Sequence, residues 1–143
     1  MNRLMEQAKA IKDDMIVYRR TIHNNPEVGS KLLKTKTYVM DRLKEFGYNP
    51  EEICESGIVA TIKGDKPGKT FLLRADMDAL PMKESTECDF KSTNGCMHSC
   101  GHDMHTAMLL GAAKLLKQNQ NEIEGTIKLV FQPDEEGFTG AKR

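Results

Sequence analysis

The sequence predicts an α/β fold in which helices are layered on a sheet. Two segments near the N-terminus space their apolar residues as amphipathic helices do. Two short apolar runs follow across a turn, and a further helical pattern precedes a last apolar run. The order helix, helix, strand, strand, helix, strand is typical of α/β proteins, and it predicts a right-handed crossover between the second and third strands.

The first predicted helix covers residues 3–22, where apolar residues fall near helical spacing. Pro26 and Gly29 interrupt this pattern. The second helix is predicted over residues 32–46, and Gly47 stands where a left-handed residue would end it.

Residues 58–63 and 70–74 are predicted strands, and the turn at 64–68 predicts that they pair as a hairpin. Residues 126–131 form the last predicted strand, which is mostly apolar and is therefore expected at the centre of the sheet.

Residues 75–102 show little periodicity and predict a long loop, of the kind that is usually functional or mobile. The third helix follows from about Met104. Its small residues Gly111 and Ala112 are expected to let it pack closely on the sheet.

Composition narrows the possible functions. The 143 residues are enough for one domain, taken as residues 1–143, and Lys plus Arg equals Asp plus Glu at 21 each. The balanced charge argues against nucleic-acid and membrane-surface binding. No apolar run approaches the roughly 20 residues that span a bilayer. The N-terminus lacks the apolar region of a secretory signal, so a cytoplasmic location with reduced cysteines is expected.

A cluster of potential metal ligands precedes the third helix. His98, Cys100 and His102 alternate, and Asp103 and His105 follow. Thiolate and imidazole groups bind zinc and similar ions, and the absence of paired CxxC or HxxxH units favours a catalytic over a structural site. The alternative is a polar loop that caps the helix, with Asp103 as N-cap and the histidines solvated.

Cys96 and Cys100 allow one further interpretation, that of a thiol-redox protein. Their CxxxC spacing differs from the usual CxxC, so this alternative has less support. His23, in the turn after the first helix, is expected to be solvated or to cap that helix, and contact with an active site is the alternative.

Acidic residues follow two of the predicted strands. Asp76 and Asp78 follow one strand, and Glu135 and Glu136 follow the last. Ligands of open α/β sheets gather beyond the carboxyl ends of strands, so these groups and the Cys/His cluster can meet at one edge. Acidic turn residues with no ligand are the alternative. Arg74 can pair with Asp76 or Asp78 or hold a substrate carboxylate, and the alternative is simply a charge at the end of a strand.

The chain resembles the M20 family of metallopeptidases, within it the amidohydrolase branch that includes hippurate and auxin-conjugate hydrolases. Four segments carry the resemblance in the family's order: RRTIHNNPEVG, LLRADMDALPM, MHSCGHDMHTAMLLGAAKLL and GTIKLVFQPDEEGFTGAK. The resemblance implies metal ligation by Cys100, His102 and Glu136, and Glu135 as general base. It implies a supporting role for Asp78. Asp76 replaces a ligand histidine of other M20 branches, which puts a metal role for Asp76 in doubt.

The resemblance also implies a fold and partners. The fold would be the N-terminal part of a zinc-peptidase-like catalytic domain with an α/β/α sheet, without the family's lid or dimerisation domain. The cofactor would be one or two divalent ions of Zn, Mn, Co or Ni, and the substrate an N-acyl amino acid or short peptide. A homo-oligomer is possible, and neither a nucleic acid nor a membrane is expected as partner.

The family's remaining histidine ligands are expected after Arg143, where this sequence ends. The chain is therefore predicted to be a fragment that is a poor catalyst by itself. His98 and His105 are further candidate ligands. The alternative function is that of a non-catalytic metal-binding remnant of such an enzyme.

Overall fold

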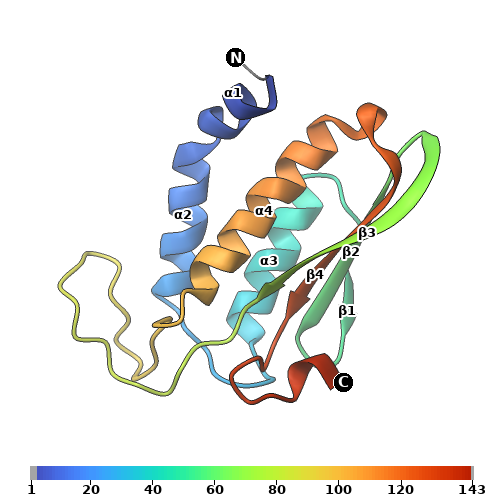
Figure 1. The fold of residues 1–143 in the computed structure, drawn as a ribbon. Coiled ribbons are helices and arrows are strands. Elements are labelled where there is room, and N and C mark those ends of the chain that lie inside the picture. The colour runs from blue at the N-terminus through green and yellow to red at the C-terminus, as the bar shows by residue number, and fades with distance from the viewer. Residues whose placement is uncertain (1–2, 143) are drawn as a thin grey trace.

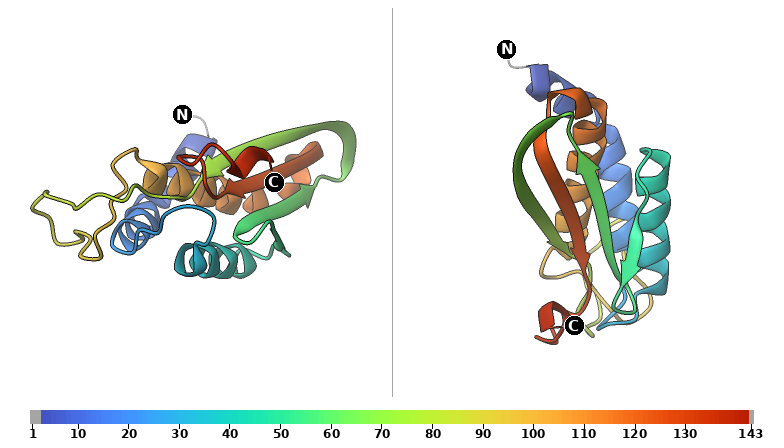
Figure 2. Two further views of the ribbon diagram at one scale, coloured as in Figure 1. Left: turned by 90° about the horizontal axis from the view of Figure 1, so that it is seen from below. Right: turned by 90° about the vertical axis from the view of Figure 1, so that its right-hand side faces the viewer.

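The computed structural model describes residues 3–142. The helices are α1 (Arg3–Ala10), α2 (Lys12–His23), α3 (Leu33–Glu45) and α4 (His102–Gln118), with short 3-10 helices η1 (Gln120–Glu122) and η2 (Gly140–Lys142). The strands are β1 (Glu51–Ile53), β2 (Gly57–Lys63), β3 (Lys66–Asp76) and β4 (Glu124–Gln132). This mixture confirms the α/β class. In the described part of the chain, α2, α3 and α4 lie on one face of the sheet (Figures 1 and 2).

The sheet has the strand order β1-β2-β4-β3. Strand β2 pairs antiparallel with β4, and β3 pairs parallel with β4. The central position expected for β4 is confirmed, but the predicted hairpin between residues 58–63 and 70–74 is wrong. The physical reason is burial: Leu129 and Phe131 of β4 are fully buried, and a strand with such side chains is covered best between two others.

The first predicted helix is divided in two. Helix α1 ends at Ala10 and α2 begins at Lys12, with Ile11 buried between them. Neither glycine nor proline occurs near the break, so the sequence contained no signal for it.

Gly111 does not face the sheet as predicted. A Cβ atom at this position would lie 2.2 Å from the sulfur of Met15, so the missing side chain allows α4 to approach α2. Ala112, by contrast, lines a pocket with Leu73 of β3. Gly111 therefore packs on α2, and Ala112 faces β3 across a pocket, so the close helix–sheet contact expected for the two residues is wrong for Gly111.

One core joins the sheet to α3 and α4. Its fully buried aliphatic and aromatic members come from α3, α4 and the strands, or lie directly beside these elements: Leu32, Val39, Leu43, Ile58, Ala60, Met77, Leu110, Ala113, Leu129 and Phe131. This packing fixes the start of α4 next to the carboxyl ends of β3 and β4, from which the long loop 77–101 extends (Figure 1). Within residues 3–142, no helix is both long and apolar enough to cross a membrane.

Candidate metal centre

Three segments that are distant in sequence meet at one edge of the sheet. Asp76 is the last residue of β3, and Glu135 and Glu136 follow β4 closely. Because β3 and β4 are parallel, their carboxyl ends lie at the same edge, where α4 also begins with His102. Asp134 adopts a positive φ of 58°, and this turn sends the chain back toward the edge after β4.

The predicted ligands lie together. One potential ligand atom from each of Cys100, His102 and Glu136 falls within 4.8 Å of the others. The ring Nε2 of His102 lies 3.9 Å from Glu136 Oε1 and 3.8 Å from Glu135 Oε2. His102 is buried, Glu136 is half-buried and Cys100 is exposed. The geometry meets the requirement for a shared site, and the individual ligand roles stay predictions.

Asp78 orients these residues through hydrogen bonds. Its Oδ1 accepts a hydrogen bond from the backbone N–H of Glu135, and its Oδ2 accepts one from Glu136, both at 3.0 Å. Its backbone carbonyl accepts a 2.8 Å bond from Nδ1–H of His102. With Nδ1 as the donor, Nε2 is left free to face the carboxylates, as expected of an imidazole ligand oriented by a neighbouring oxygen.

The charges shift the protonation of these groups. Burial by itself raises the pKa of Asp78, but hydrogen bonds from His102 and from the two backbone N–H groups lower it below its usual range. The side chain of Asp78, with the charge of Asp76, raises the pKa of His102 to about 9. The hydrogen bond with Glu136 raises the pKa of the Cys100 thiol. Without a metal ion, the raised pKa values therefore favour the protonated forms of His102 and Cys100.

A divalent cation fits this donor set. Glu136 Oε1 is buried with no hydrogen-bond partner in the described structure, which is costly for a carboxylate oxygen. Thiolate, imidazole and carboxylate are the ligands of zinc and related ions, with bonds of about 2.0–2.3 Å. Ligand atoms within 4.8 Å of one another can be bridged by a single ion after small adjustments. Two such groups share His102, so one or two ions are compatible with the site.

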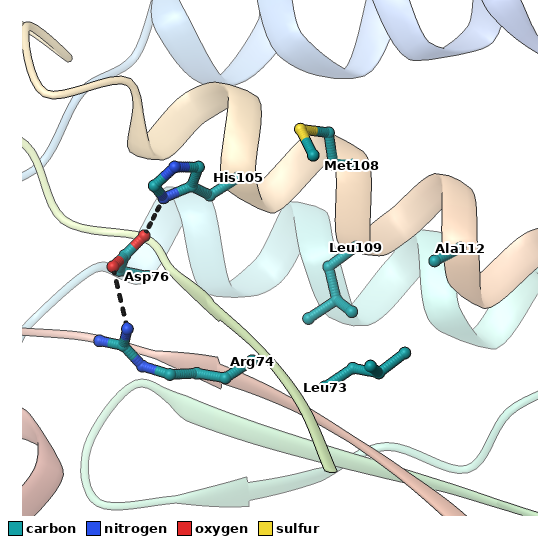
Figure 3. A pocket seen from close by; sticks show the side chains of 7 residues that line it. All are labelled: Leu73, Arg74, Asp76, His105, Met108, Leu109 and Ala112. Carbon is teal, nitrogen blue, oxygen red and sulfur yellow. Dashed lines mark hydrogen bonds and ion pairs between the residues drawn. The ribbon is translucent and has the colours of Figure 1, made fainter. Parts of the chain in front are cut away.

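The second group consists of Asp76, His102 and His105. Asp76 Oδ1 lies 2.5 Å from Nδ1 of His105, and its Oδ2 lies 3.2 Å from Arg74 and 3.7 Å from His102. Arg74 thus pairs with the carboxylate of Asp76, as one interpretation of its sequence position predicts. Figure 3 shows His105, Asp76 and Arg74 joined in a chain.

A pocket of about 390 Å³ opens beside this chain of polar residues. Its remaining wall is apolar and consists of Leu73, Met108, Leu109 and Ala112 (Figure 3). The pocket includes Asp76 and His105 but none of Cys100, Glu135 and Glu136. It therefore adjoins the candidate metal centre without containing its predicted ligands.

Other residues of the Cys/His segment lie outside the ligand set. His98 is buried, burial lowers its pKa to about 4, and neither ring nitrogen has a hydrogen-bond partner in the described structure. Asp103 is not the N-cap of α4, a position held by Gly101, but a buried residue of its first turn. Cys96 and Cys100 are free thiols.

His23 is neither solvated nor a simple cap. It is buried between Glu84 and Asp103, the residue that directly follows His102 in the chain. No sequence pattern singles out Glu84, because a glutamate in an aperiodic loop is ordinarily exposed.

Comparisons with known proteins identify a family and several similar sequences and structures. The family model described as peptidase family M20/M25/M40 matches residues 72–143. The thermostable carboxypeptidase 2 of Saccharolobus solfataricus is 48% identical over 147 residues, which cover 99% of this chain and 37% of the relative. The N-acyl-L-amino acid amidohydrolase of Geobacillus stearothermophilus is 42% identical over 132 residues, covering 91% and 36%.

A solved structure shares the fold. The YXEP protein of Bacillus subtilis, described as a dinuclear metal binding peptidase from the M20 family, superposes with a TM-score of 0.90 at 39% identity. The match covers 94% of this chain and 38% of that one. The chain thus spans little more than a third of the length of these proteins.

Proposed function

This chain belongs to peptidase family M20/M25/M40, and from that premise we propose that it carries part of the active site of a metal-dependent hydrolase of N-acyl amino acids. The observation that supports the proposal best is the convergence of Cys100, His102 and Glu136, with Glu135 beside them. A similarity to an N-acyl-L-amino acid amidohydrolase supports the substrate class, and short peptides are the related alternative.

In the proposed site, Cys100, His102 and Glu136 hold a divalent ion such as zinc, manganese, cobalt or nickel. When bound, such an ion polarises the scissile carbonyl and makes water acidic enough to lose a proton near neutral pH. Asp78 fixes the backbone of both glutamates and the ring of His102, so these side chains keep their orientation through the reaction.

Glu135 is the proposed general base. Its side chain is 36% exposed, and its Oε2 lies 3.8 Å from Nε2 of His102, so it borders both the site and solvent. Glu135 accepts a proton from the attacking water and later gives it to the leaving nitrogen. One water is consumed, the amide C–N bond breaks, and the products are a carboxylic acid and an amino acid.

The test is hydrolysis of N-acetyl and N-benzoyl amino acids by the metal-loaded chain, compared with Glu135→Gln. The variant should retain its metal content and lose about 10²–10⁴-fold in turnover, because an amide cannot accept the proton. Glu87→Gln, a change of an exposed glutamate in the long loop, is the matched control and should leave turnover unchanged. Turnover that survives chelation, or that survives Glu135→Gln, would refute the proposal.

We further propose that this chain is a slower catalyst than the longer relatives. Its described residues offer few ligands for two ions, since both candidate groups depend on His102. Positioning of substrate can account for about 7–11 kcal/mol of a barrier, and this chain covers only 37% of the length of the thermostable carboxypeptidase 2. Tight metal binding with no turnover at all would favour the alternative, a non-catalytic metal-binding module.

A further inference from the structure

A group of buried charges lies next to the candidate metal centre but contains none of its predicted ligands. His23, Glu84 and Asp103 are 5%, 2% and 1% exposed. Charged side chains are rarely buried so completely unless they are paired. Arg19 reaches the group from α2 and donates a 2.9 Å hydrogen bond from Nε to Asp103 Oδ2.

The ring of His23 bridges the two carboxylates. Nδ1 lies 2.8 Å from Asp103 Oδ2, and Nε2 lies 3.0 Å from Glu84 Oε1. Ionised carboxylates only accept hydrogen bonds, so the form of the ring with an N–H at both nitrogens satisfies both partners. Two cations, His23 and Arg19, then balance two anions, Glu84 and Asp103, inside the fold.

The bridge connects three separate segments. His23 is the last residue of α2, Asp103 lies in the first turn of α4, and Glu84 belongs to the long loop 77–101. Glu84 is fixed in turn, because its Oε2 accepts a 2.7 Å hydrogen bond from the backbone N–H of Ser92. Burial by itself raises the pKa of Glu84, but the hydrogen bonds from His23, Thr86 and Ser92 lower it to about 2.

The edge of the bridge is covered by the same loop. The ring of Phe90 meets His23 edge-on with centroids 5.3 Å apart. The guanidinium groups of Arg19 and Arg20 lie 5.3 and 4.8 Å from the centre of the Phe90 ring. Water is therefore largely excluded, and interactions between the buried charges are strong.

We infer that His23 is a positioning residue of the metal centre, which fixes the first turn of α4 and the loop 77–101 through Asp103 and Glu84. Asp103 directly follows His102, and the loop ends in Cys100 and Gly101. The bridge therefore constrains the segments before and after the ligand positions Cys100 and His102, which only Gly101 separates. This inference rests on the metal site proposed above, but it makes a separate claim about what determines its affinity.

The test compares cobalt binding by three forms of the chain. His23→Gln leaves one net negative charge in the buried group. Its amide can donate to one of the two carboxylates, but its oxygen then lies against the other, and both of these groups only accept hydrogen bonds. In His23→Gln/Glu84→Gln, the amide of residue 23 can donate to Asp103 and accept from the new amide at 84, and the charges balance again. The measurements are the thiolate-to-cobalt absorption band and the dissociation constant by chelator competition.

We expect His23→Gln to weaken cobalt binding about 10–100-fold, as substitutions behind metal ligands commonly do, and to alter the absorption band. The double variant should recover most of both. Tyr48→Phe is the stability control, because it removes a buried 2.8 Å hydrogen bond to the carbonyl of Ala113 away from the centre. It should lower the melting temperature without changing the affinity of the folded chain.

The possible outcomes distinguish the role of His23 from the proposed function. Wild-type affinity and spectrum in His23→Gln would overturn the inference and leave the proposed function standing. A loss that merely follows melting temperature, as in Tyr48→Phe, or that the double variant does not recover, would also overturn it. A wild-type chain that binds no cobalt would overturn the metal site and this inference together. Weakened cobalt binding with no hydrolysis would support the inference while the proposed function fails.

Discussion

At the scale of single residues, protons compete with the metal for His102 and Cys100. Acidic neighbours raise the pKa values of both groups, that of His102 to about 9. An imidazole or thiol must lose its proton before it can bind an ion. The carboxylates that complete the site thus also hold its other ligands in the protonated form, so ion binding and proton release are coupled.

We therefore expect zinc affinity to rise steeply with pH. Below the raised pKa, the His102 ring is protonated and each proton released on binding adds about tenfold in affinity per pH unit. Affinity should increase from pH 6 to pH 8, with a contribution from the Cys100 thiol as well. Chelator competition at several pH values measures this slope.

Cys100→Ser provides the control for that slope. It removes one titrating ligand and should reduce the slope by about one proton, while the part due to His102 remains. An affinity that does not change between pH 6 and pH 8 would contradict the raised pKa of His102.

At the scale of secondary-structure elements, the junction where β3 and β4 begin depends on Gly125. Its φ is +87°, and a Cβ atom there would lie 2.1 Å from the carbonyl oxygen of Lys69. The register between the two strands shifts in this region, between Lys66 and Thr70. The carbonyl of Gly125 also accepts a 2.9 Å hydrogen bond from Gly64, which follows β2. Three strands thus converge on one residue that has no side chain.

We expect Gly125→Ala to destabilise the fold more than Gly95→Ala. Gly95 has a similar φ of +85°, but a Cβ atom there meets nothing within 4 Å. Gly95→Ala should lower the free energy of unfolding by about 1–2 kcal/mol, the cost of a left-handed residue. Gly125→Ala should cost a further ~1–3 kcal/mol because backbone atoms must move. Urea unfolding measures both free energies. Equal losses in the two variants would show that the close approach to Lys69 does not contribute to stability.

At the scale of the whole molecule, β3 lies at the edge of the sheet that residues 3–142 form. Phe71 and Leu72, adjacent on this strand, are 57% and 60% exposed. A long apolar edge strand presents hydrogen-bonding groups and apolar surface to other chains. Such an edge is expected to be covered, either by further protein or by a second copy.

We predict that the isolated chain associates in a concentration-dependent manner and that Leu72→Lys weakens this association. A lysine on an edge strand opposes pairing with another strand. Val28→Lys is the control, since Val28 is 41% exposed but lies in the turn after α2. Sedimentation velocity over a range of concentrations measures the effect. A chain that remains monomeric throughout, or that responds equally to both variants, would contradict the role of the β3 edge.

The sequence by itself determined the α/β class, the approximate positions of most helices and strands, and the central place of β4. Apolar periodicity encodes these features locally, because each element must bury one side. The sequence also indicated that Glu136, His102 and Cys100 would share one edge, since parallel strands place their carboxyl ends together.

The tertiary structure alone decided which distant segments are partners. Whether β2 pairs with β3 or with β4 depends on the burial of side chains more than 60 residues away, as in the pair Ile58 and Phe131. Gly111 packs on α2 instead of the sheet, and His23 finds Glu84 across 61 residues of sequence. A local pattern records that a residue is buried or polar, but its partner is selected by the packing of the whole chain.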